Sequence, residues 1–89
     1  MPDPLTLTAQ DTPNPNAVKF TLNRVVATQG TTYRDAHHAG VAWARQLLEI
    51  PGVIQVFALN SFISINKVPE ANWQVIGPEV ERVLRQAFA

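Results

Sequence analysis

Two adjacent histidines close to an aspartate are the residues whose chemistry stands out first. Asp35, His37 and His38 supply one carboxylate and the chain's only two imidazoles within four positions. Carboxylate and imidazole groups are ligands of iron and zinc in proteins. Adjacent residues diverge by about 100° on a helix and face opposite sides of a strand, so one ion cannot easily take both imidazoles. The pattern favours imidazoles exposed at a helix start, and a loose metal site at Asp35, His37 and His38 is the alternative hypothesis.

A loop of alternating prolines and asparagines is the second candidate. Pro13, Asn14, Pro15 and Asn16 follow one another, and the residue before a proline is driven to an extended conformation. Such a fixed loop can present its amide groups to a protein partner. The same amides can instead hydrogen-bond the local backbone and hold the turn. Both interpretations stay open, and for Lys67 contact with an acidic partner competes with a plain solvated charge.

No arrangement typical of an enzyme accompanies these candidates. The acidic residues are scattered, Ser61 and Ser64 lack the motif of a nucleophile, and the glycines form no phosphate loop. The 89 residues contain no cysteine, which excludes a disulfide, a thiol nucleophile and a cysteine-bound cluster within this chain. We therefore expect a protein that is not an enzyme and binds no cofactor through cysteine. Iron would need oxygen and imidazole ligands.

The length and charge of the chain limit which classes of partner and which cellular locations are expected. A chain of 89 residues is one domain, expected over residues 5–89 with residues 1–4 as a flexible N-terminus. Seven basic and seven acidic side chains give zero net charge, which argues against nucleic acid and against an anionic membrane. No apolar run reaches the ~20 residues that span a bilayer, and the N-terminus does not resemble a signal peptide. We expect a cytoplasmic protein with a protein partner, while the oligomeric state stays open.

The segment Val53–Lys67 gives the strongest indication of the fold that must position these residues. Two runs rich in β-branched and aromatic residues flank Asn60 and Ser61, a pattern typical of a β-hairpin. In the second run isoleucine alternates with serine and asparagine, so one face is apolar and the other polar. A sheet with one polar face is covered on one side only.

Two further strands and two helices complete the expected fold. Apolar residues alternate over 5–8 and again over 18–23, and a weaker signal at 31–33 indicates a further brief strand. A helix is predicted to begin near Val41 and to stop before the Pro51-Gly52 pair. The last helix runs to Phe88 as one helix bent at Pro78.

Capping residues and element order complete this prediction. Asp35 can cap a helical turn ahead of the first helix, and Asn72 can cap the last helix. The fold class is α+β: a mainly antiparallel four-stranded sheet with two helices packed on one face, in the order ββαββα.

Three stretches together form a distinctive pattern. They are Thr12-Pro13-Asn14-Pro15-Asn16 running into Val18-Lys19-Phe20; Leu47-Leu48-Glu49-Ile50 followed by Gly52-Val53 and Val56-Phe57; and Phe62-Ile63-Ser64-Ile65 with Lys67, Trp73 and Pro78-Glu79-Val80. From roughly Leu5 to Phe88 the chain thereby resembles the N-terminal domain of the Nfu/NifU family of iron–sulfur cluster proteins. The double Pro-Asn loop before a strand is the most specific part of the resemblance.

The resemblance implies a domain that normally precedes a separate domain with a Cys-x-x-C pair, whose thiolates carry the cluster. That second domain is missing from these 89 residues, so the resemblance implies an accessory or docking role, with iron association attributed to the family but no ligands assigned. The expected function is a non-catalytic accessory domain of iron–sulfur cluster assembly. It would bind a cluster scaffold or a client protein through a sheet edge or the loop at 13–16. The alternative is a general protein-interaction module with no metal role.

Overall fold

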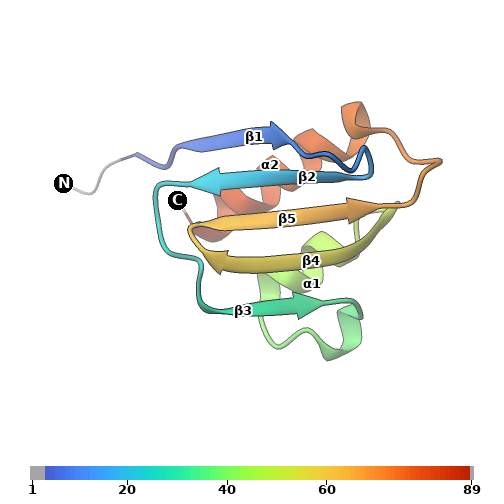
Figure 1. Ribbon diagram of the computed structural model, residues 1–89. Coiled ribbons are helices and arrows are strands. Elements are labelled where there is room, and N and C mark those ends of the chain that lie inside the picture. The colour runs from blue at the N-terminus through green and yellow to red at the C-terminus, as the bar shows by residue number, and fades with distance from the viewer. Residues whose placement is uncertain (1–3, 89) are drawn as a thin grey trace.

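The computed structural model describes residues 4–88, in which five antiparallel strands and two α-helices form the fold (Figure 1). The strands are β1 (Leu7–Asp11), β2 (Ala17–Leu22), β3 (Ala27–Tyr33), β4 (Val53–Asn60) and β5 (Phe62–Lys67). The helices are α1 (Ala42–Leu48) and α2 (Trp73–Phe88), and a 3₁₀ turn at Ala36–His38 precedes α1. The predicted flexible N-terminus, residues 1–4, lies outside the described residues except for Pro4.

The predicted α+β class is confirmed, whereas the four-stranded sheet is wrong. The sheet has the order β1-β2-β5-β4-β3, and the fifth strand, β3, makes the element order βββαββα. The sequence of β3 does not predict a full strand, because most of its side chains are exposed and apolar residues do not alternate along it. The first strand also lies later than expected, because its pairing with β2 continues to Asp11 opposite Val18.

The predicted hairpin is confirmed as β4 and β5. Asn60 lies at the turn with a φ of 52°, a left-handed conformation that asparagine tolerates better than most residues. Ile63 and Ile65 are fully buried on the helix-facing side, and Ser64 on the other side is partly exposed. The polar alternation therefore marks the uncovered face of the sheet.

Both predicted caps are present. The Asn72 side chain accepts a hydrogen bond from the Gln74 backbone N–H at 2.8 Å, at the start of α2. α2 then continues through Pro78 as one helix, helped by Gly77, which has no Cβ to clash with the proline ring. Asp35 caps the short turn before α1, accepting from the His37 backbone N–H at 2.9 Å.

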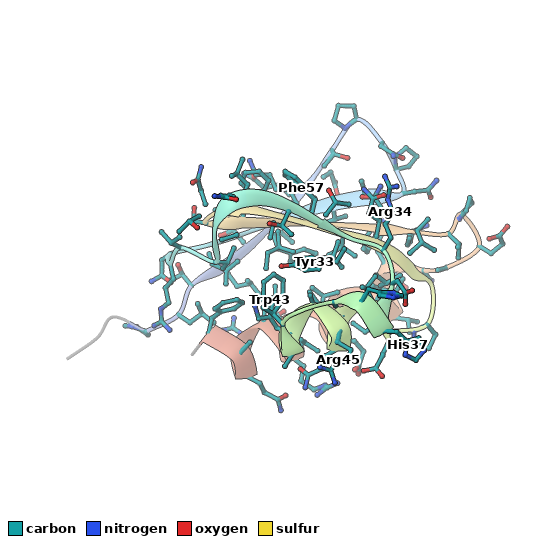
Figure 2. The ribbon with its side chains drawn as sticks, turned by 90° about the horizontal axis from the view of Figure 1, so that it is seen from below. Tyr33, Arg34, His37, Trp43, Arg45 and Phe57 are labelled. Carbon is teal, nitrogen blue, oxygen red and sulfur yellow. The ribbon has the colours of Figure 1, made fainter. Side chains whose placement is uncertain are left out.

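The hydrophobic core lies between the sheet and the helices, which occupy the same side of the sheet (Figure 2). Its largest fully buried side chains are Leu47, Val56, Ile63, Ile65, Ile76, Val80, Val83 and Leu84. Between α1 and β4 the chain passes through Gly52 with a φ of 97°, and a Cβ there would lie 2.6 Å from that of Ala71. Among residues 4–88 no helix is long and apolar enough to cross a membrane.

Candidate functional site

The Pro-Asn loop between β1 and β2 is held by its own side chains. The Asn14 Oδ1 atom accepts a hydrogen bond from the Asn16 backbone N–H at 2.9 Å. The Thr12 hydroxyl lies 2.9 Å from the carbonyl oxygens of both Asn14 and Ala17. These contacts support the structural interpretation of Asn14, whose amide fixes the turn. Pro13, Asn14 and Pro15 are exposed, so the loop still presents a shaped surface to solvent.

Lys67 anchors the same loop from β5. Its side chain is only 7% exposed, so the interpretation as a solvated charge is wrong. The reason is its place on the helix-facing side of β5, where Nζ donates to Asn16 Oδ1 at 3.1 Å and to the Val68 carbonyl at 3.3 Å. Nζ also lies 5.7 Å from the centre of the Trp73 ring, whose Nε1–H donates to the Pro15 carbonyl at 3.0 Å. The fold thus joins Pro15, Asn16 and Lys67 into one anchored unit, and their contact with a partner stays a prediction.

Asp35 and His38 form a pair beside α1, and His37 lies at the end of the helix layer (Figure 2). His38 Nδ1 is 2.7 Å from Asp35 Oδ2, and the two side chains are 84% and 50% exposed. The hydrogen bond from the His38 imidazole, followed by that from the His37 backbone, lowers the pKa of the Asp35 carboxyl. Among the described residues no group of three or more histidine, aspartate or glutamate side chains gathers as a metal site. Iron binding at this turn stays a prediction.

The uncovered face of the sheet carries an aromatic pair and two cations. The rings of Phe57 and Phe62 lie 6.1 Å apart, and Lys19 Nζ sits 4.4 Å from the centre of the Phe62 ring. Arg34 Nε donates to Gln55 Oε1 at 3.0 Å. Figure 2 shows Phe57 and Arg34 on the side of the sheet away from the helices. This face offers partly exposed apolar area to a protein partner.

A groove opens at the β1 edge, between β1 and α2. Ala9 and Asp11 lie on the helix-facing side of β1, opposite the buried Phe20 and Val18, yet both are exposed. The groove has a volume of about 310 Å³. It is lined by Ala9 and Asp11 of β1, Val18 and Phe20 of β2, and Trp73, Gly77, Pro78 and Glu81 of α2.

The groove is the feature that sequence reasoning missed. The alternation that begins at Leu5 and Leu7 continues through Ala9 to Asp11, which places a small residue and then a charged one on the side expected to be apolar. That departure from the apolar pattern was the available signal that the helices leave the end of β1 open. The sequence alone could not show that β1 and Glu81 of α2 line the same groove.

At the opposite edge of the sheet, aromatic rings pack beneath β3, and an open cavity of about 370 Å³ lies where β3 ends, lined by Thr32, Tyr33, Arg34, Asp35 and His38. Tyr33 at the end of β3 meets the Trp43 ring edge-to-face, with ring centres 5.8 Å apart. Trp43 in turn packs against Phe88 with ring centres 5.5 Å apart. Figure 2 shows Tyr33 and Trp43 between the sheet and α1. Trp43 packs against the core, although its side chain is only partly buried.

Known proteins resemble this chain over most of its length. The chain is 39% identical over 85 residues to the "NFU1 iron-sulfur cluster scaffold homolog, mitochondrial" of Drosophila persimilis, covering 90% of this chain and 29% of that protein. It is 29% identical over 82 residues to "Conserved virulence factor C" of Staphylococcus aureus (strain USA300), covering 91% of this chain and 22% of that protein. The chain therefore spans less than a third of the length of these two relatives.

Solved structures share the fold. The crystal structure of protein SAV1430 from Staphylococcus aureus matches with a TM-score of 0.78 and 32% identity, covering 86% of this chain and 94% of that one. The solution structure of a NifU-like protein from Saccharomyces cerevisiae has a TM-score of 0.78 and 24% identity, over 96% of this chain and 81% of that one, and supports the fold alone. A family model described as "Scaffold protein Nfu/NifU N terminal" matches residues 7–89, so the chain belongs to the Nfu/NifU N-terminal family.

Proposed function

We propose that this chain is a non-catalytic accessory domain of iron–sulfur cluster assembly that binds a protein partner in the cytoplasm. Its membership of the Nfu/NifU N-terminal family carries the proposal. Because the 89 residues contain no cysteine, any thiolate that holds a cluster must come from another domain or another chain. The partner is therefore a protein that carries a cluster or receives one.

The geometry supports binding more readily than catalysis. The described cavities are open grooves on the surface, and the strongly polar pairs are all exposed: Asp35 with His38, Glu79 with Arg82, and Glu81 with Arg85. The anchored loop at 13–16 and the exposed β1 edge lie side by side and are both suited to contact with a second protein. These features support a docking role for that end of the molecule.

Affinity purification from the source cells tests the proposal. The chain would carry a small tag, and proteins that co-purify would be quantified against the tag fused to an unrelated domain of similar size. We expect enrichment of Cys-x-x-C cluster carriers or of iron–sulfur client proteins. Enrichment of another class of protein alone would favour the general interaction module instead. Turnover of a substrate by the purified chain would contradict the non-catalytic role.

Iron binding is a separate part of the proposal and is tested at Asp35, His37 and His38. Iron(II) added without oxygen to ¹⁵N-labelled protein would broaden the amide signals of this turn if the three residues bind the ion. A His38→Ala variant is the matched control and should lose the broadening. Unmoved signals across the turn at stoichiometric iron would reject the site.

A further inference from the structure

The free edge of β1 is formed by residues whose side chains also face the groove. The Leu22 backbone N–H donates to the Ser61 carbonyl on the β5 side, so Leu22 directs its backbone groups away from β1. Its register partner Leu7 must then turn its own N–H and C=O outward, and the same holds for Ala9 and Asp11 along the strand. Within residues 4–88 no strand pairs with this side of β1. The edge can accept a sixth strand.

The groove beside that edge has an apolar floor and an acidic rim. Val18 and Phe20 of β2 form the floor. Gly77 contributes no side chain, and a Cβ built on it would meet nothing within 4 Å, so the wall of α2 recedes there. A strand added to β1 would place every second side chain over this hollow, because alternate residues of a strand face the same side.

The charges on the groove have one sign. Asp11 and Glu81 both line it, and no lysine or arginine is among its lining residues. Glu81 is paired with Arg85 at 2.9 Å, one turn further along α2, whereas the arginine itself is not part of the lining. Because Arg85 offsets much of the charge of Glu81, Asp11 supplies most of the negative charge that attracts a cationic side chain in the groove and repels an anionic one.

We propose that β1 and this groove bind an extended peptide segment of a partner protein as a sixth strand. The segment places apolar side chains over Val18 and Phe20, and a lysine or arginine between Asp11 and Glu81. Backbone hydrogen bonds to Leu7, Ala9 and Asp11 supply affinity, and the alternate side chains supply selection. The inference rests on the proposed function only for the identity of the partner.

A capped synthetic heptapeptide tests the chemistry directly. It alternates valine with threonine and has lysine at the central groove-facing position, and its counterpart has glutamate there. Added to ¹⁵N-labelled chain, the lysine peptide should shift the amides of Leu7, Ala9 and Asp11. The glutamate peptide should bind up to about tenfold more weakly, because the attraction between the lysine and the Asp11 carboxylate becomes a repulsion. Equal binding of both peptides, or shifts centred on β3, would overturn the proposal.

Two proline variants isolate the backbone contribution. Ala9→Pro removes an outward N–H from β1 without touching the ladder to β2, and should weaken the lysine peptide at least about tenfold. Thr32→Pro is the matched control on β3, where the register with β4 also leaves the Thr32 N–H outward, and should leave the affinity unchanged. Unchanged binding by a folded Ala9→Pro variant would reject strand addition.

A charge variant keeps the proposal testable even if Ala9→Pro does not fold. The variant Asp11→Asn preserves shape at an exposed position and leaves the Glu81–Arg85 ion pair in place, and it should bind the lysine and glutamate peptides with nearly equal affinity. Persistent discrimination would reject the acidic groove. Sedimentation of the free chain addresses a second copy as the occupant: a dimer that Ala9→Pro dissociates would replace the peptide proposal.

These results separate this inference from the proposed function. If the peptide binds as described but affinity purification returns no cluster-assembly protein, the groove stands and the assigned process is wrong. If assembly proteins co-purify equally with wild-type chain and with folded Ala9→Pro, the process stands and the groove is rejected as the docking site.

Discussion

The two edges of the sheet are built differently. At the β3 edge a register shift between Ala27 and Thr31 interrupts pairing, and the aromatic side chains of Tyr33 and Trp43 fill the space beneath the strand. At the β1 edge the five residues pair with β2 in unbroken register, and a groove replaces the packing. Bulges and covering groups protect edge strands against adding another strand. Aromatic packing therefore fills the space beneath β3, whereas a groove separates β1 from α2, and the proposal assigns partner binding to β1 on the basis of this difference.

Replacing Trp43, whose ring packs beneath β3, should produce the largest loss of stability. Trp43→Ala deletes the ring that joins Tyr33 to Phe88 and should lower the free energy of unfolding by about 3 kcal/mol. Urea unfolding followed by circular dichroism measures the change. Ala9→Ser at the open edge is the control and should change stability by less than about 0.5 kcal/mol. Equal losses at the two edges would contradict the contrast.

Lys67 anchors the Pro-Asn loop that follows β1, and its removal should lower stability more than removal of a lysine on the uncovered face. Lys67→Ala leaves Asn16 Oδ1 and the Val68 carbonyl without their donor and should cost about 2 kcal/mol in urea unfolding. Lys19→Ala, on the uncovered face over Phe62, should cost less than about 1 kcal/mol. If Lys19→Ala lowered the free energy of unfolding as much as Lys67→Ala, burial would not explain how much each lysine stabilises the fold.

The indole of Trp73 should make a smaller contribution to the same anchor. Trp73→Phe keeps most of the apolar surface but removes the donor to the Pro15 carbonyl, with an expected loss of about 1 kcal/mol. Amide hydrogen exchange in the loop should also become faster, since the Pro15 segment is released from α2. Unchanged exchange at Asn14 and Asn16 would show that the indole does not hold the loop.

The smallest expected effect is a change in the pKa of Asp35, which follows β3. The His38 imidazole lowers the pKa of the Asp35 carboxyl below its ordinary value of 3.8, and His38→Ala should raise it toward that value. A lowered pKa in the folded state stabilises the fold at pH values above the unfolded pKa. That contribution is lost as the pH falls through the folded pKa, and so only in acid below about pH 4. A carboxyl ¹³C titration by NMR measures the change, and identical titration curves for the two proteins would refute the assigned cause.

The parts of the fold that the sequence predicted are those in which burial follows a simple period. Ile63 and Ile65 alternate with polar residues because one side of β5 faces the core, and α2 keeps its apolar phase across Pro78 for the same reason. β3 was missed as a full strand because it is an edge strand whose pairing with β4, rather than its side chains, makes it regular.

The site was less predictable because it depends on contacts between distant segments. The burial of Lys67 requires Asn16, 51 positions away in sequence, and the Trp73 ring on the next helix. The groove likewise exists only because α2 passes beside β1 without covering it. Neither relation has a local pattern, whereas the Pro-Asn loop has one and was found.

Hydrogen exchange of the whole chain with its co-purified partner tests the central claim most directly. The amides of β1 should gain protection in the complex, led by Leu7, Ala9 and Asp11, while those of β3 should exchange as in the free chain. Protection gained at Thr32 and its neighbours on β3, with β1 unchanged, would contradict the account.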